Sequence, residues 1–139
     1  MAIKIFKPGA FDKKEFYYYM GEFFGERTYK REYPYLVNTE NTTWIVDIQD
    51  DEVAGFTSFE ITNRGIEIGD TYVKDKDMLL WERLVGYALD AAESFHPKLI
   101  YVAVPHASER DWYKQKDFEV VRTTKNYYFL ERMLDDEKA

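Results

Sequence analysis

The feature that most constrains the fold of this 139-residue chain is a change of apolar period along its length. Three segments, Thr43–Gln49, Val53–Ile61 and Ile66–Val73, are rich in branched and aromatic residues and are joined by short turns, which predicts an antiparallel meander. From Met78 to Phe95 apolar residues recur at helical spacing, and Leu99–Val104 is almost wholly apolar, as expected for a strand buried on both faces. This order predicts one right-handed parallel crossover beside the meander.

Local residues indicate the first strand and the starts of the two long helices. Ile3–Lys7 predicts a strand, and Asp12 and Asp77 are placed to cap the helices that follow them. Gly21 and Gly25 lie inside the first helical pattern. One continuous helix and two short helices with an elbow therefore both fit this region.

The C-terminal part of the chain predicts a short helix and a hairpin. Ser108 followed by Asp111 resembles a capping box, which predicts a helix that ends at about Lys116. Segments 118–122 and 127–131 then alternate in the manner of two paired strands. We expect them to close the sheet as a final hairpin.

Together these segments predict the α+β class. The expected order is β-α-α-β-β-β-α-β-α-β-β, with a mixed, mostly antiparallel sheet and flanking helices. The length suits one domain, which we place at residues 1–134, followed by a charged tail at 135–139.

Composition excludes several classes of site. The chain has no cysteine, so disulfides, thiolate catalysis and Cys-containing zinc sites are excluded, and His96 and His106 lack the spacing of metal ligands. A net charge of −7 argues against a nucleic-acid partner. The N-terminus lacks the apolar core of a signal peptide and no run of about 18 apolar residues exists, so we expect a cytoplasmic protein without a membrane partner.

The charge is unevenly distributed along the chain. From residue 40 to residue 70 the only basic residue is Arg64, against eight acidic residues: Glu40, Asp47, Asp50, Asp51, Glu52, Glu60, Glu67 and Asp70. Such a segment can attract a cationic substrate. It also fits a solvated sheet edge with acidic turns, so both interpretations stay open at this stage.

The stretch Trp112-Tyr113-Lys114-Gln115-Lys116-Asp117-Phe118 carries a family resemblance. With the order of the predicted elements, it resembles the GNAT superfamily of acetyl-CoA-dependent N-acetyltransferases, in which aromatic-Tyr-x-Lys-x-Gly-Phe commonly follows the buried strand. The resemblance covers almost the whole chain. Asp117 replaces the family's glycine, but aspartate tolerates a left-handed backbone better than most residues, so we expect the turn to be retained.

The resemblance implies two catalytic residues. Tyr113 corresponds to the family's tyrosine near the coenzyme A sulfur, which makes it the candidate general acid for the leaving thiolate; a tyrosine packed in the core is the alternative. Glu67 corresponds to a glutamate that serves many members as general base, often through water; a solvent-facing strand residue is the alternative. Glu67 and Asp70 point to opposite faces of an ideal strand, so only a bulge would let both face one cleft.

The resemblance also implies where acetyl-CoA binds. The family motif Gln/Arg-x-x-Gly-x-Gly/Ala opens the long helix, whose N–H groups hold the pyrophosphate. Here Lys76 stands at the Arg/Gln position, and Leu79 and Trp81 stand at the two glycine positions. The residues implied in binding the cosubstrate are Tyr72, Val73, Lys74, Lys76, Asp77, Met78, Leu79, Leu80, Trp81 and His106.

The implied function is an N-acetyltransferase that passes an acetyl group from acetyl-CoA to a primary amine by direct attack, with an oxyanion held by a backbone N–H near Tyr72 or Val73. The absent glycines leave two alternatives open: a GNAT-like binding or interaction module without activity, or an acyl-CoA sensor. The acceptor would be a small-molecule or peptide amine, such as a polyamine, an aminoglycoside or a lysine side chain. A homodimer is compatible with the sequence.

Overall fold

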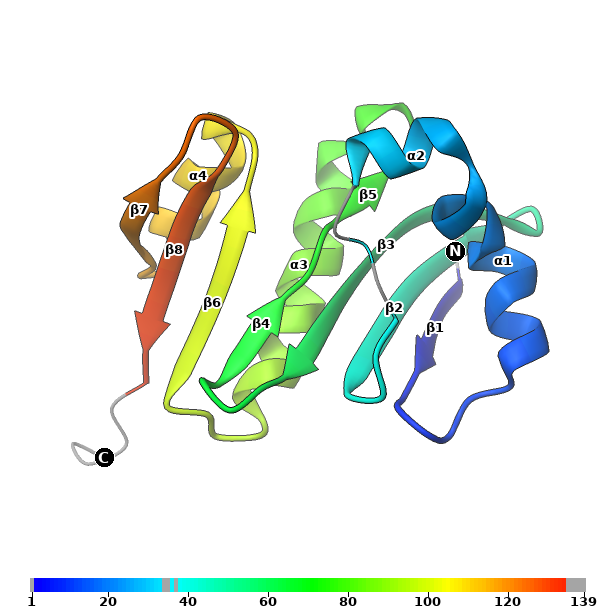
Figure 1. Ribbon diagram of the computed structural model, residues 1–139, viewed down its shortest axis with the longest axis horizontal. Helices are drawn as coiled ribbons and strands as arrows, with labels where there is room; N and C mark the ends of the chain where they lie inside the picture. Colours follow the sequence, from blue (N-terminus) through cyan, green and yellow to red (C-terminus); the bar gives the residue numbers. More distant parts are fainter. Residues whose placement is uncertain (1, 34–35, 37, 135–139) are drawn as a thin grey trace.

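The computed structural model describes residues 2–33, 36 and 38–134, which form an eight-stranded sheet with helices on both faces (Figure 1). The strand order is β1-β2-β3-β4-β6-β8-β7, and β5 pairs with β3. Among these residues the pairing of β4 with β6 is parallel and the other pairings are antiparallel, so the predicted mixed α+β fold is confirmed. The strands and helices are β1 (Ala2–Phe6), α1 (Lys13–Gly25), α2 (Arg27–Glu32), β2 (Thr42–Gln49), β3 (Glu52–Ile61), β4 (Ile66–Ile68), β5 (Tyr72–Val73), the 3-10 turn η1 (Lys74–Lys76), α3 (Met78–Glu93), β6 (Leu99–Val104), α4 (Ala107–Lys114), β7 (Glu119–Thr123) and β8 (Tyr128–Met133).

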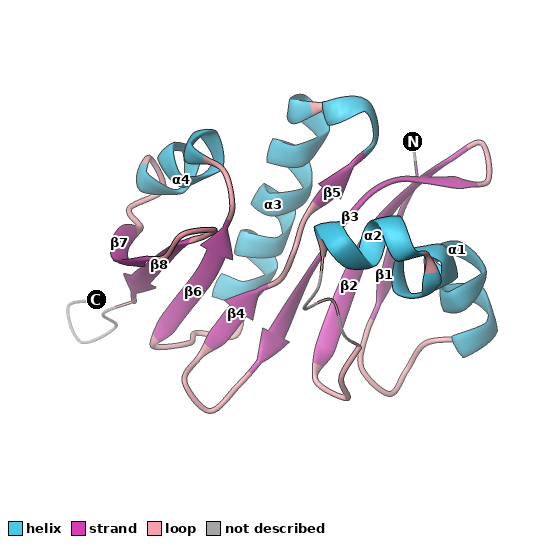
Figure 2. Ribbon diagram, turned by 45° about the horizontal axis from the view of Figure 1, so that its top comes forward, coloured by secondary structure: helices cyan, strands magenta, loops and turns pink. Residues whose placement is uncertain are grey.

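Two apolar clusters lie on opposite faces of the sheet. Helices α1 and α2 cover one face, and α3 and α4 lie on the other (Figure 2). Under α1 the rings of Phe16, Trp44 and Phe56 are fully buried, whereas Leu84 of α3 packs over Ile68 and its neighbours on the opposite face. Strand side chains alternate between the two faces of a sheet, so the two apolar clusters also fix the face to which each polar strand residue points.

A bulge interrupts the strand that the sequence predicts over Ile66–Val73. Ile68 pairs with Phe59 and Tyr72 pairs with Phe56. The segment from Ile68 to Tyr72 therefore advances by four residues where β3 advances by three, which leaves one extra residue in a bulge. The predicted single strand is therefore wrong: it is split into β4 and β5. Gly69 donates its N–H to the Ser58 carbonyl at 2.8 Å, and a Cβ at Gly69 would lie 2.3 Å from Ser58 Oγ, which is why glycine stands there.

The sheet opens beyond this bulge. Residues 66–68 of β4 pair with residues 100–102 of β6, but β5 pairs with β3 and has no described strand on its other side. Figure 1 shows β5 and β6 diverging toward the ends at which α3 and α4 begin. The opening therefore has a free strand edge on one side and two helix N-termini at its rim.

The helix boundaries follow the predicted caps in two of three cases. The side chains of Asp12 and Asp77 accept hydrogen bonds from the N–H groups of Lys14 (2.9 Å) and Leu80 (3.1 Å), as predicted. The capping box at Ser108 is wrong, because the N-cap residue of α4 is His106, two residues earlier, and its side chain makes no capping hydrogen bond.

Helix α1 continues through Gly21 and ends at Gly25, and α2 follows after one residue, so the alternative of two helices with an elbow holds. The predicted tail, 135–139, lies outside the described residues. Within the described part of the chain, no helix combines the length and apolar character needed to cross a membrane.

Candidate active site

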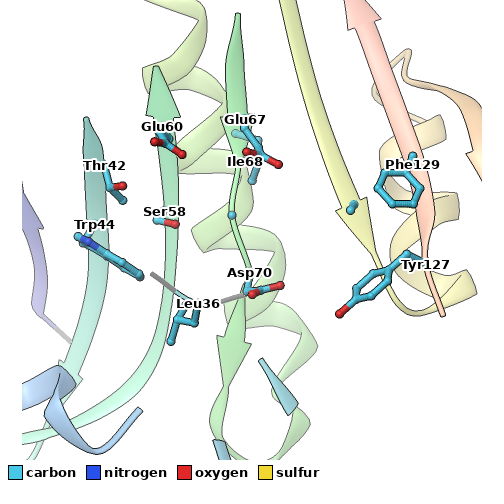
Figure 3. A pocket seen from close by; sticks show the side chains of 12 residues that line it. Leu36, Thr42, Trp44, Ser58, Glu60, Glu67, Ile68, Asp70, Tyr127 and Phe129 are labelled. Atoms are coloured by element: carbon cyan, nitrogen blue, oxygen red, sulfur yellow. The ribbon is translucent and has the colours of Figure 1, made fainter. Parts of the chain in front are cut away.

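Two pockets meet at the bulge between β4 and β5. The sheet-face pocket, of about 270 Å³, lies on the face that α1 covers, and the strand-gap pocket, of about 80 Å³, lies in the opening between β5 and β6. Asp70 lines both pockets, so it stands at their junction. The polar and aromatic residues that line the sheet-face pocket are Thr42, Trp44, Ser58, Glu60, Glu67, Asp70, Tyr127 and Phe129 (Figure 3). Those that line the strand-gap pocket include Asp70, Trp81, His106, Glu109, Tyr113 and Tyr127.

The bulge brings Asp70 and Glu67 to one pocket, although an ideal strand would separate them. Burial raises the pKa of the Asp70 carboxyl to about 6. A carboxylate in this range accepts a proton readily near neutral pH and can release it again to solvent. The sequence analysis preferred Glu67 to Asp70 as the candidate base. The bulge that directs Asp70 to this junction could be recognised only from the strand pairing.

Glu67 and Glu60 face one another across β4 and β3. Their Cα atoms are register partners, and Figure 3 shows their carboxylates on the same side of the sheet. Burial raises the pKa of Glu67, Glu60 raises it further, and the charge of Arg64 partly offsets both effects. Glu60 accepts a hydrogen bond from Thr39 Oγ1 at 2.8 Å, which fixes one of its two oxygens.

Tyr113 is both a core residue and a pocket residue. It is 1% exposed on α4, and its ring makes edge contacts with the rings of Trp112 at 5.2 Å and Phe118 at 5.0 Å between centroids. Burial raises its pKa well above the ordinary value, and the nearby charge of Glu109 adds to this effect. The two interpretations of Tyr113 are thus compatible, because the same residue also lines the strand-gap pocket.

The turn that follows α4 keeps the geometry expected of it. Asp117 has φ of 70°, and Phe118 donates its N–H to the Tyr113 carbonyl at 3.2 Å, so the predicted retention of the left-handed turn is confirmed. One turn before Tyr113, Glu109 lies on the same face of α4. Burial raises the pKa of Glu109, the charge of His106 opposes this and the charge of Asp70 adds to it. The spacing of four residues was the signal that could have identified Glu109.

The N-terminus of α3 combines free backbone donors with mixed charges. The Asp77 carboxylate accepts a hydrogen bond from the N–H of Leu80. No described residue accepts a hydrogen bond from the N–H groups of Met78 and Leu79. The Leu79 side chain is 76% exposed, but Trp81 is buried at 3% and so stays away from the helix end. A phosphate group could meet two N–H donors here, with the Asp77 carboxylate opposing it.

The other residues predicted to bind the cosubstrate lie in separate parts of the structure. His106 lies at the rim of the strand-gap pocket. Lys74 and Lys76 lie in η1 and are exposed, and Lys74 Nζ is 3.5 Å from a carboxylate oxygen of Glu52. The Tyr72 ring packs on Phe56 under α1 and α2, so any part it takes in the opening falls to its backbone. The Val73 side chain packs against the core beneath α3.

Comparison with known proteins identifies the fold. No family model and no curated protein matches the sequence. Among solved structures, an acyl-CoA N-acyltransferase from Pseudomonas aeruginosa is 15% identical, with 94% of this chain and 98% of that chain covered at a TM-score of 0.74. The PaiA N-acetyltransferase from Thermoplasma acidophilum, solved with coenzyme A, is 14% identical over 96% of this chain and 100% of its own, with a TM-score of 0.60. An acetyltransferase of the GNAT family from Staphylococcus aureus is 13% identical over 96% and 100%, with a TM-score of 0.60. The architecture described above is thus shared with these proteins over nearly its whole length.

Proposed function

We propose that this chain, which has the GNAT fold, is an N-acetyltransferase that moves an acetyl group from acetyl-CoA to a primary amine. The observation that carries the proposal is the position of Asp70, a carboxylate with a pKa of about 6 at the junction of the two pockets. The amine would occupy the sheet-face pocket and the thioester the strand-gap pocket. Asp70 would then lie where the two reactants meet.

Asp70 is the general base in this proposal. An amine enters as its ammonium form and has no free lone pair until a proton leaves it. The Asp70 carboxylate takes that proton and releases it to solvent, and the nitrogen attacks the thioester carbonyl directly. A C–N bond forms, a second proton leaves the nitrogen to Asp70, and the C–S bond breaks to release the thiolate. This assignment differs from the sequence-based expectation for Glu67, because Glu67 lines the sheet-face pocket alone.

The residues around the opening fit acetyl-CoA at both of its ends. The edge of β5 that faces β6 is unpaired in the described chain, and a strand edge of this kind pairs with an extended arm that carries amide groups. The backbone N–H groups near Tyr72 and Val73 would also serve the oxyanion. The phosphates would lie at the free N–H groups of Met78 and Leu79, beside Lys74 and Lys76.

Tyr113 would act on the leaving thiolate. Because burial raises the pKa of its hydroxyl well above that of an alkyl thiol, complete proton transfer to the thiolate is uphill. The same burial strengthens a hydrogen bond from the hydroxyl to the sulfur. We therefore assign Tyr113 the role of hydrogen-bond donor, with the proton reaching the thiol later from solvent.

One observation favours a second candidate function. The Asp77 carboxylate already caps α3 and repels phosphate, which fits a GNAT-like module that binds other partners and has lost its cosubstrate. Titration calorimetry with acetyl-CoA and with coenzyme A separates the two functions. Binding in the micromolar range supports the enzyme, whereas no binding up to millimolar concentration favours the module.

Turnover is then tested through release of free thiol with a panel of primary amines. Asp70→Asn should lower kcat by about 10²- to 10⁴-fold, the usual contribution of a general base, and leave acetyl-CoA affinity unchanged. Asp90→Asn, which removes the same charge from an exposed position on α3, is the matched control. A wild-type rate that does not rise with pH through about 6, or an Asp70→Asn variant of full activity, would remove Asp70 as the base.

A further inference from the structure

The sheet-face pocket contains more negative charge than deprotonation of one amine requires. We propose that the acceptor is a small aliphatic diamine, whose reacting nitrogen lies beside Asp70 and whose second nitrogen, an ammonium, lies between Glu60 and Glu67. This inference rests on the proposed function, since it assigns a substrate class to the same pocket.

The first argument is a pair of carboxylates whose repulsion is only partly compensated. Like charges at directly opposite positions of paired strands destabilise a sheet, and Glu60 and Glu67 occupy such positions. No described residue donates a hydrogen bond to Glu67, and no lysine or arginine is among the described residues that line the pocket. The charge of Arg64 reaches Glu67, but its Nη2 is bound to Glu131 at 2.8 Å. An ammonium group between the two carboxylates would offset their repulsion.

The second argument is the spacing of the charges. Glu67 and Asp70 are three residues apart, which is roughly 10 Å along an extended strand and less where the bulge shortens it. Figure 3 shows Asp70 set apart from the two glutamates, on the side toward Tyr127. The side chains themselves span part of this separation. Two nitrogens joined by a few methylene groups therefore match the distance between the base and the carboxylate pair.

The third argument is the size and lining of the pocket. A volume of about 270 Å³ is far larger than one water molecule needs, so the pocket has room for a small organic molecule. Tyr127 and Phe129, which are half-buried, give the pocket aromatic surface that suits methylene groups and an ammonium. A lysine side chain carries a single charge, so it would leave the carboxylate pair without a partner. Among the three classes of acceptor that the sequence left open, the polyamine class therefore fits the pocket best.

The experiment uses two readouts on the full chain. Calorimetry without cosubstrate compares butane-1,4-diamine and pentane-1,5-diamine with butylamine and pentylamine, and kcat/KM is then measured for each amine with acetyl-CoA. We expect the diamines to bind about tenfold more tightly than monoamines of equal length, which is the contribution of one charge-assisted hydrogen bond. Glu67→Gln and Glu60→Gln should reduce this ratio toward one, and the surface variant Asp90→Asn should keep it.

The outcomes separate this inference from the proposed function. Diamines that bind tightly but are never acetylated would support the pocket assignment and overturn the acetyltransferase. Equal kcat/KM for diamines and monoamines would keep the acetyltransferase and overturn the diamine. A fall of equal size for both classes of amine in Glu67→Gln would identify Glu67 as the base and also overturn the inference.

Discussion

The two pockets that meet at Asp70 are built from different parts of the chain. The sheet-face pocket is made by side chains, with the carboxylates of Glu60, Glu67 and Asp70 beside aromatic walls. The strand gap is also lined by side chains, among them Trp81 and Tyr113, but it adjoins backbone groups that are free in the described chain: the β5 edge and the N–H groups of Met78 and Leu79. Side chains change by single substitutions, whereas backbone geometry depends on the fold. Under the proposed function, the acceptor pocket can therefore change by single substitutions, whereas the backbone groups proposed for the cosubstrate do not depend on the two glycines of the GNAT motif.

The largest expected effect concerns Asp70 and the free energy of unfolding. The folded-state pKa of Asp70 is raised from 3.8 to about 6, so the folded chain binds this proton more tightly than the unfolded chain and loses stability as pH rises between those values. Asp70→Asn removes the titration and should stabilise the protein at pH 8 by at most about 3 kcal/mol, with no gain below about pH 4.

Chemical denaturation at pH 4, 6 and 8 measures this difference. Asp90→Asn again serves as the control, because its carboxyl is exposed. A gain that is equal at all three pH values would show that the Asp70 carboxyl is not the group that titrates.

The next effect concerns Tyr113, which lines the strand-gap pocket. Tyr113→Phe keeps the ring contacts with Trp112 and Phe118 and removes only the hydroxyl. If the hydroxyl stabilises the departing thiolate, kcat should fall about 10- to 100-fold with the acetyl-CoA dissociation constant unchanged. Thiol release under saturating substrates gives kcat, and unfolding midpoints check that the core is intact. An unchanged kcat would leave Tyr113 as a core residue alone.

A smaller effect is expected at the N-terminus of α3. Asp77→Asn keeps an N-cap side chain for the Leu80 N–H and removes the negative charge. If the phosphates lie there, coenzyme A should bind about two- to fivefold more tightly at low salt, the range of one charge near a helix end. Calorimetry at two salt concentrations measures this gain, which should shrink as salt rises. If neither the substitution nor the salt concentration changes the affinity for coenzyme A, the phosphates bind at another place.

Local residues predicted most of the fold but not the junction of the site. The caps at Asp12 and Asp77 and the turn at Asp117 depend on contacts within a few residues, so they could be inferred from the sequence. The bulge depends instead on the close approach of Gly69 to Ser58 of a neighbouring strand. Without that pairing, alternation directed Asp70 away from Glu67.

Other parts of the site depended on the sheet in the same way. Glu60 and Glu67 become a pair only once the register of β3 and β4 is known. The capping box at Ser108 was wrong because α4 begins directly after His106, where the chain leaves β6. Propensity at one residue was overridden there by the position of the strand end.

The smallest expected effect tests whether the turn after α4 has only a structural role. Asp117 is exposed with φ of 70°, a conformation that costs an L-residue about 1 kcal/mol and glycine very little. Asp117→Gly relieves this strain but adds freedom to the unfolded chain, so the net gain in stability should stay below about 1 kcal/mol. Asp50→Gly, with φ of 52° in the β2–β3 turn, is the matched control and should gain a similar amount. If turnover changes in Asp117→Gly but not in Asp50→Gly, the turn also positions Tyr113, and the strand gap then depends on local backbone geometry for its side chains as well as for its N–H groups.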